Sequence, residues 1–147
     1  MAHRDAGRYS GKQAPGTQLD ANLADTIRAR CPDDMLACGT AERISKDVRT
    51  EMSEVGVAAD LLEMKIGRCQ LGLFGWGSKP NHGKDIVAAE SVTADMRNAL
   101  VETAHNGKVT CEALWRIADQ LGVGRKEVSA ACDALGFKIG ACQLGAF

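Results

Sequence analysis

The sequence predicts a mainly α-helical protein with short β segments, in which two tandem repeats form a pseudo-twofold pair. The ten-residue segment Lys65–Phe74 returns as Lys138–Phe147, 73 residues later. Without a gap, 16 of the 37 positions in 38–74 are identical to their partners in 111–147. Apolar residues recur at helical spacing before each copy, whereas the glycines within the segment interrupt a helix. These observations predict that one helical unit occurs twice along the chain.

The duplication divides the chain into four predicted parts. Residues 1–18 are rich in glycine and polar side chains and are expected to form a flexible or partner-ordered tail. The first repeat occupies 19–74, a Gly/Pro linker occupies 75–92, and the second repeat occupies 93–147. A unit of about 55 residues buries only a modest fraction of its surface. We therefore expect the repeats to pack on each other or on a partner.

Three helices and one extended segment are predicted in the first repeat. Asp20 is expected to cap a first helix, which Pro32 ends. A second helix is expected to begin near Thr40, and a third to run from about Ser53 to Leu62. The repeated segment holds too many glycines for a helix. It is expected to be extended or to form a short hairpin.

The second repeat shows the same elements with clearer boundaries. Thr93 is expected to cap its first helix, and Asn106-Gly107 to form a left-handed turn after it. A short strand is predicted at Val109-Thr110. The next helix is expected to end at Gly122, and the last one to bury Val128.

Residues 117–128 have the pattern of a helix-turn-helix. Ala118 is small where two helices cross closely, Gly122 tolerates the positive φ of the turn, and Val123 fills the turn. A helix precedes this pattern and a glycine-interrupted extended segment follows it. Residues 93–147 therefore resemble the broad helix-turn-helix/winged-helix superfamily.

The resemblance implies contact with double-stranded DNA through the second repeat. In such domains the second helix of the motif enters the major groove. The side chains that would meet DNA lie on that helix and on the wing after it: Arg125, Lys126, Ser129 and Lys138. Winged helices also serve as packing or protein-contact modules. Both alternatives stay open at this point.

The first repeat departs from this pattern. Ser45 and Arg49 replace the small residue and the turn glycine, while Glu51 and Glu54 stand where a DNA-reading helix would need cations. Residues 20–74 hold ten acidic and seven basic side chains, a net charge of −3. Carboxylates near phosphate are unfavourable. The first repeat is expected to keep the fold and to make no groove contact.

The repeated segment contains residues that core packing does not explain. Its Ile, Leu and Phe are expected to be buried, and its glycines to allow close backbone approach. The Cys-Gln pair is expected to contact something shared by both repeats, or its counterpart across a pseudo-twofold axis. The repeated residues in question are Lys65, Cys69, Gln70, Lys138, Cys142 and Gln143.

Four of the six cysteines follow the duplication, namely Cys38, Cys69, Cys111 and Cys142. Four converging thiols would suit zinc or an iron–sulfur cluster. However, the sequence has no CxxC motif, and no histidine stands at ligand spacing from these thiols. Buried core thiols are therefore favoured over a metal site, and no cofactor is predicted.

The remaining observations concern the class of function. Walker, HExxH and GxSxG motifs are absent from the sequence, so it does not predict an enzyme. No apolar run approaches the roughly 20 residues of a membrane span, and the amino end lacks the apolar stretch of a secretory signal. We expect a cytoplasmic protein with no membrane partner. The favoured function is that of a DNA-binding, transcriptional-regulator-like protein. The alternative is a protein-interaction module, or an accessory subunit of a larger assembly such as a redox or metalloenzyme complex.

Overall fold

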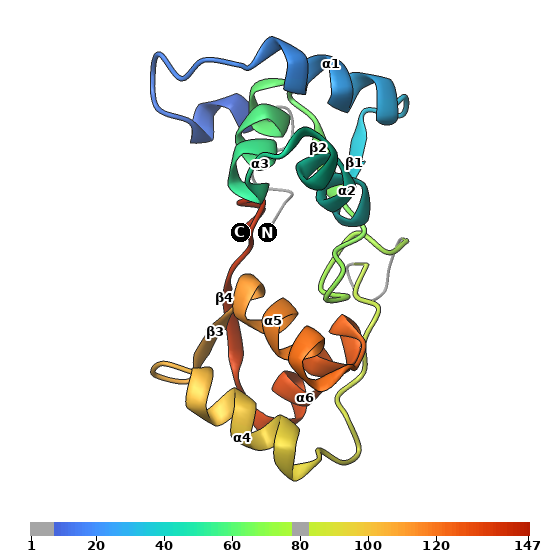
Figure 1. The fold of residues 1–147 in the computed structure, drawn as a ribbon, viewed down its shortest axis with the longest axis vertical. Helices are drawn as coiled ribbons and strands as arrows, with labels where there is room; N and C mark the ends of the chain where they lie inside the picture. The colour runs from blue at the N-terminus through green and yellow to red at the C-terminus, as the bar shows by residue number, and fades with distance from the viewer. Residues whose placement is uncertain (1–7, 78–82) are drawn as a thin grey trace. The chain divides into compact units, whose positions relative to one another are not determined.

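The computed structural model of the chain describes residues 8–77 and 83–147 (Figure 1). These residues form six α-helices, one 3₁₀ helix and four short strands. The order helix, strand, helix, helix, strand occurs twice along the chain. The predicted class, mainly α with short β segments, is confirmed. None of the helices in the described residues is both long and apolar enough to cross a membrane.

The chain forms two compact units, and their boundaries differ from the predicted repeat boundaries. Unit 1 contains the described residues up to Cys69 together with Gln143–Phe147. Unit 2 contains the described residues of Gln70–Cys142. The last five residues of the predicted repeats 19–74 and 93–147 are therefore exchanged. Each unit is completed by the end of the other repeat.

Unit 1 contains the elements of the first repeat. They are η1 (Tyr9–Lys12), α1 (Ala21–Arg30), β1 (Met35–Ala37), α2 (Cys38–Val48), α3 (Met52–Leu61) and β2 (Lys65–Gly67). The Asp20 carboxylate accepts a hydrogen bond from the backbone N–H of Leu23 at 2.8 Å, so the predicted N-cap is confirmed. Arg49 ends α2 in the left-handed conformation.

Unit 2 contains the elements of the second repeat. They are α4 (Ala94–Thr103), β3 (Lys108–Thr110), α5 (Cys111–Leu121), α6 (Arg125–Leu135) and β4 (Lys138–Ala141). Thr93 caps α4 as predicted, since its hydroxyl accepts from the backbone N–H of Met96 at 3.2 Å. Gly122 ends α5 with φ +66°, which is the turn that its position predicts.

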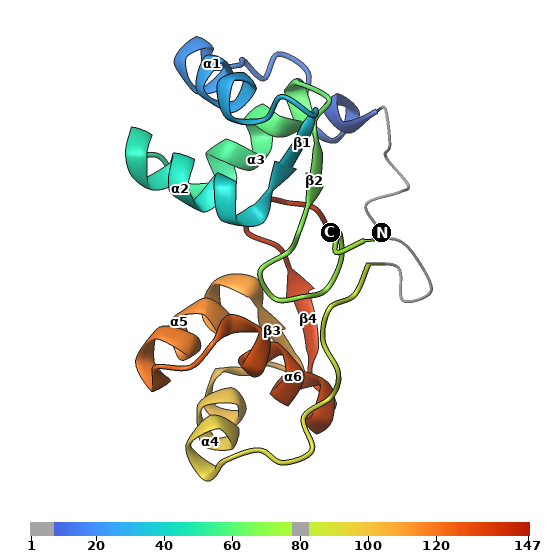
Figure 2. The same ribbon diagram turned by 90° about the vertical axis from the view of Figure 1, so that its right-hand side faces the viewer.

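Each unit has a two-stranded parallel sheet (Figure 2). Met35 of β1 lies opposite Lys65 of β2, and Lys108 of β3 lies opposite Lys138 of β4. The Lys-Ile-Gly at the start of each repeated segment is thus a strand, and the hairpin alternative is wrong. Its partner strand precedes the second helix of the same repeat. The strand β1 was not predicted, because three residues are too few to show an alternating pattern.

The repeated segment is buried less uniformly than predicted. Its leucines are buried in both copies, with exposed fractions of 0% for Leu71 and 2% for Leu144. Ile66 is buried, but Ile139 is only half-buried. Phe74 and Phe147, the last residues of the two copies, are half-buried as well. The predicted burial is therefore found in both copies for the leucine.

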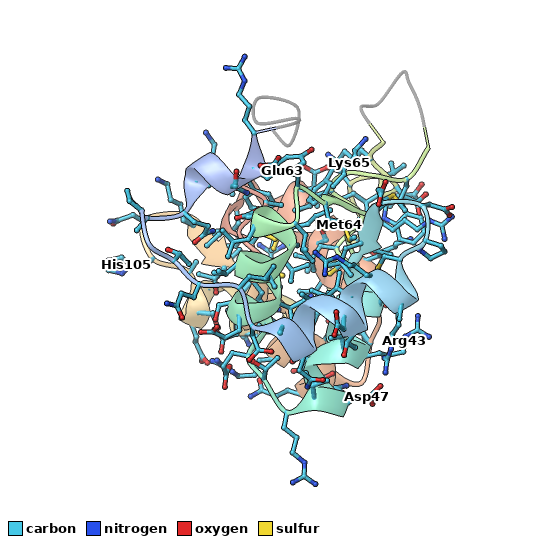
Figure 3. The ribbon with its side chains drawn as sticks, turned by 90° about the horizontal axis from the view of Figure 1, so that it is seen from above. Arg43, Asp47, Glu63, Met64, Lys65 and His105 are labelled. Atoms are coloured by element: carbon cyan, nitrogen blue, oxygen red, sulfur yellow. The ribbon has the colours of Figure 1, made fainter. Side chains whose placement is uncertain are left out.

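Residues 8–18 belong to the segment that was expected to form a flexible or partner-ordered tail, and they pack on unit 1. The helix η1 packs on α3, and Tyr9 is buried. The Glu63 carboxylate, labelled in Figure 3, accepts hydrogen bonds from the backbone N–H groups of Ser10 and Tyr9, each at 2.8 Å. A hydrogen bond from the Ser10 side chain, followed by those from the backbone N–H groups of Ser10 and Tyr9, holds the pKa of Glu63 below its usual range. Residues 1–7 of the predicted tail lie outside the described residues.

The left-handed residue between the second and third helices gives a first testable prediction. Arg49 has φ +56°, where the second repeat has Gly122 at φ +66°. A non-glycine residue in the left-handed conformation costs roughly 1–2 kcal/mol. Glycine avoids this cost, but it loses more conformational freedom on folding, so part of the gain in stability is offset. Arg49→Gly should therefore raise the stability of unit 1 by about 1 kcal/mol.

The matched change is Gly122→Arg in unit 2, which should lower the stability of that unit by a similar amount. Nothing lies within 4 Å of a Cβ placed at Gly122, so the change reports on the backbone alone. Hydrogen exchange measured by mass spectrometry would compare amides of α2 and α3 with those of α5 and α6. Unchanged or weakened protection of α2 and α3 in Arg49→Gly would contradict the prediction.

Candidate functional site

Arg125, the first residue of α6, is held by two partners within unit 2. Its guanidinium carbon lies 3.6 Å from the centroid of the Trp115 ring on α5. Its Nη1 donates a hydrogen bond to Oε1 of Gln70 at 2.8 Å. Stacking on an indole and bonding to an amide stabilise a partly buried guanidinium. The side chain predicted to contact DNA is therefore directed against its own unit.

Lys126, the second residue of α6, is held in a similar way. Its Nζ lies 3.8 Å from the centroid of the Trp76 ring and pairs with the Asp85 carboxylate. Trp76 thus provides a cation–π partner for Lys126 within unit 2.

The other two predicted DNA contacts lie in different environments. Ser129 is only 1% exposed, and its hydroxyl has no hydrogen-bond partner among the described residues. Its prediction as a surface residue is wrong, because it faces inward on α6. Lys138 is exposed on β4, next to the exposed Lys108. The four side chains thus do not form one solvent-facing surface.

The segment before α4 covers one face of α6. Lys84 pairs with Asp133 at 3.3 Å, and the backbone N–H of Ala89 donates to the Ala130 carbonyl at 3.1 Å. Together with Lys126, these α6 residues stand at helix positions i, i+4 and i+7, which share one face. Residues 83–92 were predicted to be linker and contain no helix or strand. Residues 78–82 of that linker lie outside the described residues.

A Gly-Lys pair occurs in this covering segment and in a corresponding segment of unit 1. Gly83-Lys84 repeats Gly11-Lys12, 72 residues earlier. Lys12 pairs with Asp60 on α3 at 3.0 Å, as Lys84 pairs with Asp133 on α6. In unit 1, Gln13 also donates to Asp60, at 2.7 Å. We call residues 8–18 and 83–92 the arms. Aligning the two repeats at a fixed offset of 73 residues does not match the two Gly-Lys pairs. A gap of one residue in that alignment would match them.

A docked segment lies against α3 in unit 1. This segment is Gln143–Phe147, whose red end lies beside α3 in Figure 1. A Cβ at Gly56 would lie 2.2 Å from the carbonyl oxygen of Leu144, so only glycine admits this backbone. From the arm, Lys12 Nζ donates to the Gly145 carbonyl at 2.9 Å. Burial of Leu144 and the contacts of its backbone define the site.

The corresponding docked segment of unit 2, Gln70–Phe74, has the same backbone conformation at its glycine. Gly72 has φ +73° and Gly145 has φ +72°. The Gly72 carbonyl accepts a hydrogen bond from the backbone N–H of Asp85 in the arm, at 2.8 Å. In both units, a buried leucine precedes a left-handed glycine whose carbonyl is held by the arm. The repeat counterpart of Gly56 in unit 2 is the buried Ser129.

The repeated residues other than leucine fall into three positions. Lys65 and Lys138 are exposed at the starts of β2 and β4. Cys69 and Cys142 are the last residues before the docked segments, and Cys69 is the more buried of the two. Gln143, like Gln70, begins a docked segment and is half-buried. The exchange of segments thus begins at the Cys-Gln pair.

The duplicated thiols are divided between the two units. Cys38 and Cys69 belong to unit 1, while Cys111 and Cys142 belong to unit 2. All are free thiols. Among residues 8–77 and 83–147, no group of three or more His, Cys, Asp or Glu side chains is placed to hold a metal ion. Burial, and then the charge of Asp133, raises the pKa of Cys132 to about 12.

Thiol reactivity gives a second prediction. Alkylation requires the thiolate and access to it. Cys132 is 1% exposed and neutral at pH 8, whereas Cys142 is half-buried. In the folded protein, N-ethylmaleimide should therefore modify Cys142 well before Cys132, as followed by peptide mass spectrometry. Equal rates in native buffer would contradict the burial of Cys132, and equal rates in denaturant provide the control.

The close approach at Gly56 gives a third prediction. Gly56→Val should destabilise unit 1 by about 1–3 kcal/mol, because α3 and the Leu144 backbone must move apart. Gly140→Ala is a suitable control, since the nearest atom to its new Cβ would be the flexible Lys108 side chain at 3.8 Å. Hydrogen exchange of α1 and α3 would measure the change. Equal protection in the two variants would show that the docked segment is not held over Gly56.

Comparison with known proteins adds no family to these observations. No protein-family model, no curated protein and no solved structure matches the chain. Its function is therefore inferred from the contacts of its own residues.

Proposed function

We propose that the chain is a non-catalytic protein-interaction module, an accessory subunit of a larger assembly, built from two helix-turn-helix-like units. The observation that supports this proposal is the occupation of α6. The helix that would read DNA in a winged-helix protein is covered by the docked segment and the arm of unit 2. Arg125 bonds to Gln70 of the first, and Lys126 to Asp85 of the second.

The charge that remains exposed on α6 also disfavours DNA contact through this helix. The exposed charged residues of α6 are Glu127 and Asp133. Both carry carboxylates, which repel phosphate. A groove-reading helix needs cations directed outward, whereas Arg125 and Lys126 are held by partners within unit 2.

Protein interaction is favoured because each unit already binds a short segment from outside its own repeat, in which the leucine lies in a turn. The segment contributes one buried leucine and one backbone carbonyl held by the arm. These are ordinary means of recognising a short peptide segment: an apolar anchor for specificity and backbone hydrogen bonds for orientation. The same fold is therefore suited to hold segments of other chains.

DNA binding through another surface is the second candidate. Lys108 and Lys138 are exposed and lie opposite each other in register at the start of the β3–β4 sheet. Two adjacent lysines can neutralise two phosphates of a duplex. Lys138 is also one of the residues that the sequence predicts to contact DNA.

The fourth prediction separates these candidates. In fluorescence anisotropy against mixed duplex DNA, the protein should bind no tighter than the roughly 10⁻⁴–10⁻⁶ M typical of non-specific contacts at physiological salt. Affinity purification from native lysate after nuclease treatment should retain a protein partner in stoichiometric amount.

The matched variant is Lys108→Ala with Lys138→Ala. If the wild type binds duplex tightly and this variant lowers the salt slope by about two, the DNA candidate replaces the interaction module. Arg125→Ala should instead loosen unit 2, because it removes the contacts with Trp115 and Gln70. Tryptophan fluorescence would detect this, since both tryptophans belong to unit 2.

A further inference from the structure

The site that receives Gln143–Phe147 in unit 1 consists of local contacts. Gly56 supplies the space for the Leu144 backbone, and Lys12 supplies a hydrogen bond to the Gly145 carbonyl. Asp60, only 3% exposed, orients Lys12 through their ion pair. None of these contacts depends on a covalent connection between the segment and unit 1. The same segment from another molecule would make the same contacts.

The site is also incomplete without its segment. With the segment absent, the backbone of α3 at Gly56 would lose its covering carbonyl, and the apolar surface that buries Leu144 would face water. Exposing one buried leucine costs about 1.5–3 kcal/mol before any rearrangement. An open site therefore has a strong tendency to take up a segment of the same kind.

The exchange of segments identifies the occupant. Unit 1 holds the end of the second repeat, and unit 2 holds the end of the first. An exchange of equivalent elements is the arrangement that converts a monomer into a swapped dimer at low cost. We infer that the Gly56 site of unit 1 binds Gln143–Phe147 of a second copy of this chain, giving a segment-swapped dimer. This inference rests on the proposed interaction function and names one partner for it.

Concentration controls the balance between the two forms. Within one molecule, the segment competes at an effective concentration of the order of mM for a short flexible connection. The closed monomer is therefore expected at micromolar concentrations, and the dimer population should grow as the protein approaches the mM range. Variants that break the internal docking remove this competition.

A complementation experiment tests the inference with the full chain. Gly56→Val closes the receiving site but leaves the segment intact. Leu144→Asp disables the segment but leaves the receiving site intact. Each variant alone should be monomeric in size-exclusion chromatography with light scattering. An equimolar mixture should form a heterodimer at concentrations where the wild type is still a monomer, because one functional site and one functional segment remain.

Two further measurements make the outcome decisive. A labelled peptide of residues 140–147 should bind Leu144→Asp at least tenfold more tightly than it binds wild type or Gly56→Val. If either variant fails to fold, the single variant Gly140→Ala provides the dimer fraction of a folded protein for comparison. A mixture that stays monomeric, together with a peptide that does not distinguish the three proteins, overturns the inference.

Failure of this inference can be distinguished from failure of the proposed function, because the complementation experiment uses only purified protein. A protein that remains monomeric but retains a lysate partner contradicts the swapped dimer alone. A protein that dimerises by complementation but also binds duplex DNA tightly contradicts the interaction module alone.

Discussion

The leucine that each repeat contributes to the other repeat's unit is the contact on which this structure depends. Leu144 is buried over Gly56 in unit 1, and Leu71 is fully buried in unit 2. Removing a buried leucine side chain typically costs about 2–5 kcal/mol, which is a large part of the stability of a small domain. A left-handed glycine after each leucine turns the chain so that the arm can hold its carbonyl. Neither repeat is a complete unit without this exchange.

The exchange also accounts for how the side chains of α6 are used. Arg125 and Lys126 would be typical cations at the start of a groove-reading helix, and the sequence pattern alone favours that function. In the structure, Arg125 donates a hydrogen bond to the Gln70 amide oxygen, Lys126 pairs with the Asp85 carboxylate, and each cation lies over an indole ring. The residues that resemble a DNA-reading surface thus stabilise the docked segment and the arm. This difference favours the proposed interaction module, which holds short segments of chain.

Features specified by neighbouring residues were predictable from the sequence. The caps Asp20 and Thr93 and the turn at Gly122 lie where predicted, because a capping side chain or a glycine acts within three or four residues. Long-range partners were not predictable in this way. The parallel pairing of β1 with β2 joins segments some thirty positions apart, and the docked segments bind the other repeat's unit.

Two parts of the site were missed for different reasons. The Gly-Lys arms left a signal, but it lies one residue out of the register that aligns the rest of the repeat. The burial of Ser129 left none, since a serine on a polar-looking helix face usually indicates solvent. Its counterpart Gly56 in unit 1 is buried as well, but there the absence of a side chain admits the Leu144 backbone.

Hydrogen exchange of two leucine variants tests the central claim most directly. Leu144→Ala should weaken protection in α1 and α3, which belong to the first repeat, and leave α5 and α6 unchanged. Leu71→Ala should do the reverse, and it alone should shift the tryptophan fluorescence of unit 2. If Leu144→Ala instead loosens α5 and α6, the segment is docked on its own repeat, and the exchange described here is contradicted.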